Sequence, residues 1–88
     1  MTHKRIEYDG HAIHDMDIRG FSRSDVKRIL FTGVHQLERT DWGEQRHSRS
    51  AYIGAKRPAK VVYLENAERF YIISVQWLDR RLGKGTPE

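Results

Sequence analysis

The chain has 88 residues, no cysteine and a formal net charge of +4, with 38% hydrophobic and 32% charged residues. These values predict one globular domain and exclude disulfide bonds and cysteine-based zinc sites, which favours a cytoplasmic protein. No apolar run approaches the roughly 20 residues of a membrane-spanning helix, and the basic first residues are not followed by the apolar segment of a signal peptide.

The hydrophobic pattern predicts an α+β domain over residues 1–88, with residues 83–88 as a loose tail. We expect two short helices, over residues 11–19 and 23–31, packed on a mainly antiparallel four-stranded sheet with short connections. A short leading strand is expected in front of the helices. The predicted strands, the leading one first, cover residues 6–8, 34–39, 48–53, 60–65 and 70–77.

The ends of the two helices carry specific local signals. Gly20 suits the left-handed position just past a helix end, because glycine has no Cβ to clash there. Ser22 is a suitable N-cap for the second helix, and Asp25 places a carboxylate in its first turn. Gly33 is a suitable stop. The sequence therefore predicts a helical hairpin with a tight turn at residues 20–22.

Residues 70–77 form the strongest predicted strand, which we expect to be central in the sheet. Because side chains alternate along a strand, one set shares a face: Tyr71, Ile73, Val75 and Trp77. We expect Tyr71 and Trp77 to belong to the core.

Positive charge is concentrated in the second half of the chain. Between Gln45 and Lys60 there is no acidic residue, and basic side chains also follow the last predicted strand. Such a distribution attracts polyanions, so it favours a nucleic-acid partner, although an acidic protein could cover the same face.

Several residues stand in a characteristic order along residues 8–78: His11, Met16, Arg19, Gly20, Ser22, Val26, Gly33, Val61-Val62-Tyr63 and Ile72-Ile73-Ser74-Val75. This order resembles a family of small bacterial and archaeal domains that are grouped with BrnT and RelE-type toxins. The resemblance implies a RelE-like fold and a toxin that cleaves RNA and is silenced by an antitoxin. Asp15 departs from the family, which often has a basic residue four positions after the first histidine.

Cleavage of RNA without a metal requires a base for the ribose 2′-hydroxyl, an acid for the leaving 5′-oxygen and cations for the phosphate. Histidine suits the first two roles and arginine the third. On a strand, His47 and Arg49 would share one face, and Arg46 and Ser48 the other. The pair His47 and Arg49 can thus serve as an acid or base beside a phosphate ligand. A solvated edge strand, charged to block aggregation, is the other interpretation.

The candidate site has two groups of residues. The expected catalytic set is His47, Arg49, Lys60 and His11. The expected RNA contacts are Arg46, Lys56, Arg57, Arg80 and Arg81. Lys60 belongs to the first group because it begins a strand beside the basic segment and can face the same groove.

The histidines of the first helix have two interpretations each. His11 can act as a general base or phosphate contact, or it can hydrogen-bond the junction of helix and sheet. His11 and His14 lie one turn apart and could bind a metal with Asp15 or Asp17, but no third strong ligand is spaced for it. We therefore expect solvent-facing histidines, no metal and no other cofactor.

The sequence thus predicts the toxin of a type II toxin–antitoxin pair, acting as a metal-independent endoribonuclease. Its expected partners are RNA and an antitoxin protein, with no membrane, and the pattern leaves homo-oligomers open. The alternative is a non-catalytic module of the same fold that binds nucleic acid or protein.

Overall fold

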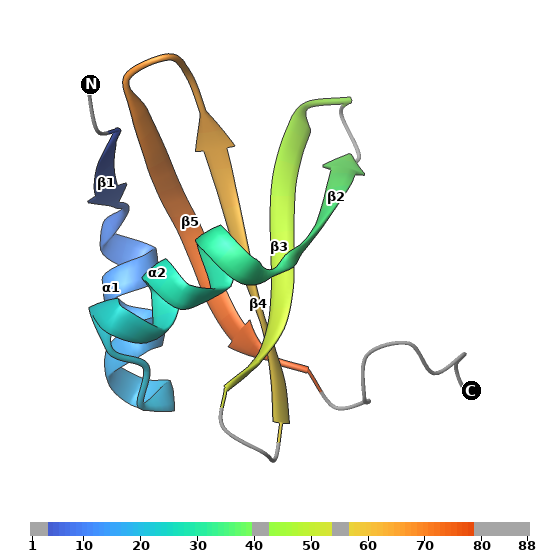
Figure 1. Cartoon of the computed structure of the whole chain (residues 1–88). Helices are drawn as coiled ribbons and strands as arrows, with labels where there is room; N and C mark the ends of the chain where they lie inside the picture. The colour runs from blue at the N-terminus through green and yellow to red at the C-terminus, as the bar shows by residue number, and fades with distance from the viewer. Residues whose placement is uncertain (1–3, 40–42, 54–56, 79–88) are drawn as a thin grey trace.

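The computed structural model describes residues 4–39, 43–53 and 57–78 of the chain. Five strands form one mixed sheet in the order β1-β5-β4-β3-β2 (Figure 1). Strand β1 runs parallel to β5, and all other neighbouring strands are antiparallel. The strands are β1 (Arg5–Tyr8), β2 (Val34–Arg39), β3 (Gln45–Ile53), β4 (Arg57–Glu65) and β5 (Arg69–Trp77). The α+β class, the antiparallel meander and the leading strand are therefore confirmed.

Strand β5 is an interior strand, as expected, because it pairs with β1 on one side and with β4 on the other, and β4 is the middle strand of the five. The bounds of two other strands are corrected. Strands β3 and β4 each begin three residues earlier than expected, and their hairpin pairs as far as Ile53 opposite Arg57. Pro58 consequently lies inside β4, opposite Tyr52.

Helices α1 (Gly10–Arg19) and α2 (Arg23–Thr32) have the ends that the sequence predicts. Gly20 has a φ of 78°, in the left-handed region, and its N–H donates to the carbonyl of Met16. Ser22 and Asp25 form a reciprocal capping box, in which each side chain accepts from the other backbone N–H at 3.0 Å. These local contacts fix the tight turn between the helices.

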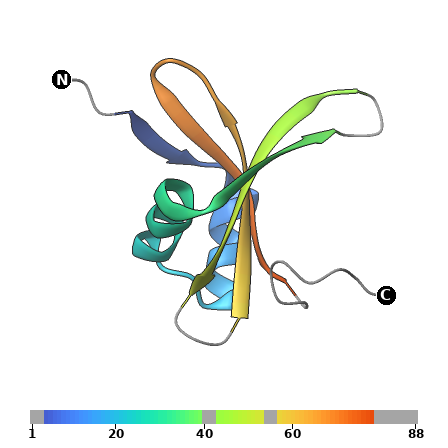
Figure 2. The same cartoon turned by 45° about the vertical axis from the view of Figure 1, so that its right-hand side comes forward.

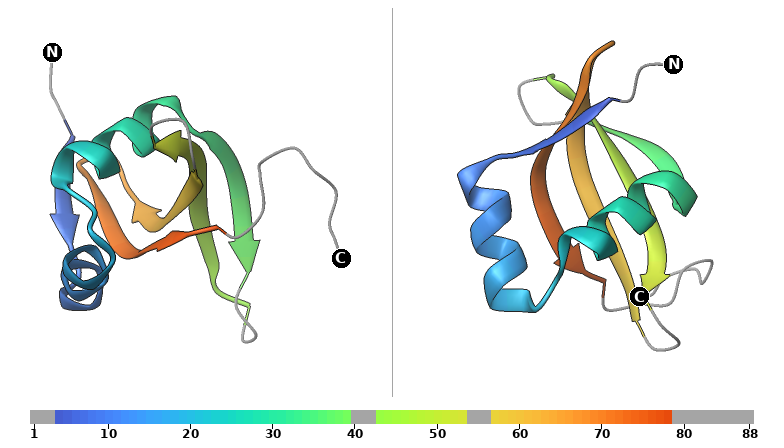
Figure 3. Two further views of the ribbon diagram at one scale, coloured as in Figure 1. Left: turned by 90° about the horizontal axis from the view of Figure 1, so that it is seen from below. Right: turned by 60° about the vertical axis from the view of Figure 1, so that its left-hand side comes forward.

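Both helices lie on the same side of the sheet (Figures 2 and 3). Helix α1 lies against β5, and α2 lies against β3 and β4. We call this side, which includes Val61 and Tyr63 of β4, the helix-bearing face, and the other side, which includes Lys60, the open face. The buried core lies between helices and sheet: Ala12, Met16, Phe21, Val26, Ile29, Leu30, Ala59, Val61, Tyr63, Ile72 and Val75.

A one-residue irregularity in β5 changes which side chains reach the core. Val62 pairs with Ser74 but Tyr63 pairs with Ile72, so Ile73 is an extra residue on β5. Ile72 and Val75 are therefore both fully buried although they lie three positions apart. The prediction that Tyr71 shares the core face of Val75 is wrong for this reason.

Trp77 does pack against the core, as expected. Its ring stacks on Phe21 with centroids 4.4 Å apart, and its Nε1 donates to the backbone carbonyl of Arg19 at 3.1 Å. Trp77 thus ties the end of β5 to the turn between the helices.

The sheet divides at one end into two hairpins (Figure 1). The pairing of β3 with β4 reaches only to His47 opposite Tyr63. Beyond this pair, β2 and β3 stay paired to Arg39 and Gln45, and β4 and β5 stay paired to Glu65. We call the place where the hairpins separate, at His47 and Tyr63, the fork. Among the described residues, no helix is long and apolar enough to span a membrane.

Candidate active site

Two histidines meet on the helix-bearing face at the fork. His35 of β2 and His47 of β3 bring Nε2 and Nδ1, respectively, to within 2.9 Å of each other. A nitrogen–nitrogen contact of this length is a hydrogen bond, in which one ring donates N–H and the other presents a lone pair. The pair therefore contains one hydrogen-bond donor and one hydrogen-bond acceptor, with His35 exposed and His47 half-buried.

Tyr63 contacts the histidine pair through His47, and Arg49 in turn contacts Tyr63. The ring of His47 stacks on that of Tyr63, with centroids 5.4 Å apart and an angle of 22° between the planes. The guanidinium of Arg49 donates from Nε to the Tyr63 hydroxyl and from Nη1 to the Gly33 carbonyl, each at 3.1 Å. The expected pairing of His47 and Arg49 on one face is confirmed. Arg49, however, is held by the protein and acts on Tyr63, so its position favours orienting the site over binding phosphate.

Lys60 does not join this group. It lies on the open face, where its Nζ donates to Glu38 at 3.0 Å. Ser48, also on the open face, donates to the same carboxylate oxygen at 2.9 Å. The Lys60 hydrogen bond is the main cause that lowers the pKa of Glu38. The expectation that Lys60 faces the groove of His47 is wrong. Lys60 pairs with Ser50, which is three residues from His47 along β3, and side chains an odd number of residues apart on a strand point to opposite faces.

Arg46 is also on the open face, as the alternation along β3 predicts. Its Nη2 pairs with Glu44 at 3.0 Å. At the far end of the sheet, Arg57 places its guanidinium 5.0 Å from the centroid of the Trp77 ring. These two expected RNA contacts therefore belong to different parts of the molecule. The other three, Lys56, Arg80 and Arg81, and the tail at 83–88 lie outside the described residues.

His11 lies on α1, away from the fork. Its Nε2 is 3.7 Å from the carboxylate of Asp15, which is buried and pairs with Arg19 at 2.6 Å. Asp15 also accepts from the backbone N–H of Val75 on β5. This arrangement favours the structural interpretation of His11, at the junction of helix and sheet. It also explains Asp15, whose carboxylate joins α1 to β5.

No metal site emerges from the described part of the chain. Within it, no group of three or more histidine and acidic side chains is arranged to hold an ion. His14 is exposed on the surface of α1.

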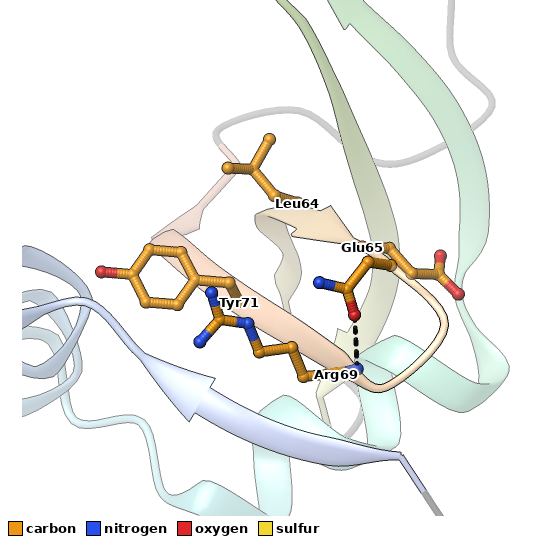
Figure 4. A pocket seen from close by; sticks show the side chains of 5 residues that line it. Leu64, Glu65, Arg69 and Tyr71 are labelled. Carbon is orange, nitrogen blue, oxygen red and sulfur yellow. Dashed lines mark hydrogen bonds between the residues drawn. The ribbon is translucent and has the colours of Figure 1, made fainter.

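A shallow hollow of about 140 Å³ lies near the β4–β5 turn (Figure 4), lined by Leu64, Glu65, Asn66, Arg69 and Tyr71. Arg69 pairs with Glu7 of β1. The Tyr71 hydroxyl donates to Asp9 at 2.7 Å, which raises the pKa of Tyr71 and lowers that of Asp9. These two contacts join β5 to β1 and to the N-cap of α1, so they have a structural role, and the hollow is not a candidate active site.

Sequence reasoning missed His35. The signal was present, because residues 34–39 were expected to form a strand next to residues 48–53. The register that places Leu37 opposite His47 also places His35 diagonally across from His47. Without knowledge of the turn length between the strands, that register could not be chosen.

Comparison of this chain with protein-family models, with curated proteins and with solved structures finds no match. The candidate site therefore rests on the geometry of the chain's own residues.

Proposed function

We propose that the chain is the toxin of a type II toxin–antitoxin pair and acts in the cytoplasm as a metal-independent endoribonuclease. The observation that carries this proposal is the 2.9 Å contact between the imidazoles of His35 and His47 at the fork. The proposed catalytic residues are these two histidines. His47 is kept from the set that the sequence indicated, and His35 is added to it.

The proposed reaction assigns one proton transfer to each histidine of the pair. One neutral imidazole takes the proton of the ribose 2′-hydroxyl, whose oxygen attacks phosphorus. The P–O5′ bond breaks, and the other, protonated imidazole gives its proton to the leaving 5′-oxygen. The products are a 2′,3′-cyclic phosphate and a 5′-hydroxyl.

A RelE-like fold is part of this proposal, and it is supported by the roles of the residues that carry the resemblance. Gly20 takes a left-handed conformation, and a Cβ on Gly33 would lie 2.5 Å from the carbonyl oxygen of Ile29. Met16 and Val26 are buried in the core. These positions thus have structural reasons for their residue types, independent of any catalytic role.

An antitoxin is the proposed protein partner. Strand β2 lies at the edge of the sheet, and its side chains Val34 and Leu37 are 70% and 59% exposed. An edge strand with exposed apolar side chains can pair with an extended segment of another chain. Because His35 lies on the same strand, a partner bound there would cover the histidine pair.

A non-catalytic binding module remains the second candidate, favoured by a specific observation. Arg46, Arg49 and Lys60 each contact a group of the protein itself. Cations engaged in this way contribute to the positive field of the surface but stabilise a transition state less directly.

Purified protein incubated with labelled RNA in the presence of EDTA tests the proposal. We expect wild-type protein to cleave, and His35→Asn and His47→Asn to lower the rate by about 100-fold or more, the range for loss of a general acid or base. His14→Asn is the matched control, because His14 is exposed on α1 away from the fork. If wild-type protein cleaves RNA and both fork variants cleave it at the same rate, the assignment of His35 and His47 as catalytic residues is refuted.

A cell-based experiment separates the two candidates. Induced wild-type protein should arrest growth, whereas His47→Asn, if folded, should not. Folded wild-type protein that binds RNA, cleaves none in isolation and causes no growth arrest would favour the binding module.

A further inference from the structure

Phe31 exposes an aromatic ring at the C-terminal end of α2. It lies in the last turn of α2 and is 61% exposed. Its ring meets that of Phe70 on β5 edge to face, with centroids 5.9 Å apart. The ring is therefore held in place on one side while much of its surface faces solvent.

Aromatic contacts continue from Phe31 to the histidine pair. Phe70 meets Tyr63 at 5.7 Å, Tyr63 stacks on His47 at 5.4 Å, and His47 meets His35 at 5.1 Å. Five rings from α2, β2, β3, β4 and β5 thus form one contiguous series on the helix-bearing face. Its outer end is the exposed ring of Phe31, and its other end is the proposed catalytic pair.

Cationic side chains lie along this series. Lys27 is exposed and precedes Phe31 by four residues on α2, so the two are neighbours on the helix surface. The Nζ atom of Lys4 lies 4.9 Å from the centroid of the Phe70 ring and is paired with Glu65, so Lys27 carries the positive charge of this argument. A ligand that covers Phe31 consequently meets a flat apolar ring and positive charge together.

We propose that Phe31 is a stacking platform for an unpaired nucleic-acid base, with Lys27 contacting a phosphate of the same strand. A single strand supplies both a flat ring and a negative charge, whereas an apolar protein segment would match only the ring. This inference rests on the proposed function in one respect: the stacked base belongs to the same strand whose phosphate reaches His35 and His47. The substrate is then single-stranded RNA, since a base in a duplex is not free to stack on Phe31.

Fluorescence anisotropy with an eight-nucleotide 2′-O-methyl RNA measures this binding. The probe lacks the 2′-hydroxyl nucleophile, so its binding is observed apart from cleavage. We expect Phe31→Ala and Phe31→Leu to weaken binding about tenfold, and Phe31→Trp to preserve it. Ile18→Ala is the matched control, because Ile18 on α1 is 60% exposed, and it should bind as wild type does. A duplex of the same sequence should show no dependence on Phe31.

The charge contribution has its own readout. Affinity falls as salt concentration rises. Lys27→Gln should reduce the steepness of log affinity against log salt concentration by about 0.7, the value for one phosphate of a single strand. Arg5→Gln, on the open side of β1, should leave the slope unchanged.

Each result decides the inference. Wild-type affinity in Phe31→Ala, or no binding of the probe by wild-type protein, would overturn it. Wild-type affinity in Phe31→Leu would also overturn it, since it would show that apolar area rather than a flat ring is required, as for a protein partner. Loss of binding in Phe31→Ala, together with no RNA cleavage and no growth arrest by wild-type protein, would support the stacking platform and refute the proposed activity. RNA cleavage by wild-type protein, together with wild-type probe binding in Phe31→Ala, would support the proposed activity and refute the stacking platform.

Discussion

His47 and Tyr63 form the last pair between β3 and β4, and their rings stack at the point where the two hairpins separate. The same Tyr63 is fully buried and accepts a hydrogen bond from Arg49 through its hydroxyl. The orientation of the proposed catalytic histidine thus depends on a side chain of the core.

Tyr63→Phe tests this dependence. The change keeps the ring but leaves Nε of Arg49 without its acceptor, so we expect the free energy of unfolding to fall by about 1–2 kcal/mol. Urea denaturation measures the loss, and Tyr8→Phe on β1 is the comparison. An unchanged midpoint would show that the Arg49 contact does not stabilise the fork.

Gly33→Ala should destabilise the protein through the junction of α2 and β2. A Cβ at this position would lie 2.5 Å from the carbonyl oxygen of Ile29 and 2.9 Å from that of Ser50. Because both neighbours are backbone, we expect a cost of about 1–3 kcal/mol, as for overpacked sites. Gly10→Ala is the control, since nothing lies within 4 Å of a Cβ there. Equal thermal midpoints for the two variants would contradict this expectation.

Acid should remove the contribution of Glu38 to stability. Hydrogen bonds from Lys60 and Ser48 outweigh burial and lower the pKa of Glu38 below its ordinary value of 4.5. A carboxylate whose pKa is lower in the folded protein stabilises it above pH 4.5, and this contribution is lost as the pH falls through the folded pKa. The difference in unfolding free energy between wild type and Glu38→Gln should therefore shrink below pH 4.5. A difference that stays constant down to pH 2 would count against the interaction, and Glu68→Gln on the β4–β5 turn provides the control.

Tyr71→Phe should raise the pKa of Asp9. The Tyr71 hydroxyl is the main cause that holds this pKa below 3.8, and the N–H of His11 is the second. With the hydroxyl removed, the carboxyl resonance of Asp9 in an NMR titration should move to a higher midpoint while the helix cap remains. In the converse variant, Asp9→Ala, the phenol pKa of Tyr71 should fall toward 10.0, because the carboxylate that raises it is gone. An Asp9 midpoint unaffected by Tyr71→Phe would exclude the contact in solution.

The parts of the fold that sequence reasoning reached are those with local signals. The caps at Gly20 and Ser22 depend on residues within one helical turn, and strand β2 was expected with its observed bounds. The alternation along β3 also placed His47 and Arg49 on one face. Such features require only the neighbouring residues, so they can be read from the chain.

The parts that sequence reasoning did not reach depend on register. The extra residue Ile73 moves Tyr71 out of the core, and nothing within β5 itself marks that position. Likewise, Lys60 and His47 lie on adjacent strands but face opposite sides, and His35 meets His47 only through the pairing of β2 with β3. The candidate site was therefore half predicted: His47 and Arg49 belong to the fork, whereas Lys60 and His11 do not.

The parallel pairing of β1 with β5 has a consequence for biosynthesis. Strand β1 is the first in the described chain, yet its partner is the last, and the contacts of Glu7 with Arg69 and of Asp9 with Tyr71 each span 62 residues. On the ribosome, β1 must therefore remain without its native neighbour until β5 has emerged, while the helices and the β2–β3 hairpin can already form. An arrest peptide placed at increasing distances after Trp77 should register the final folding step only once β5 has cleared the exit tunnel.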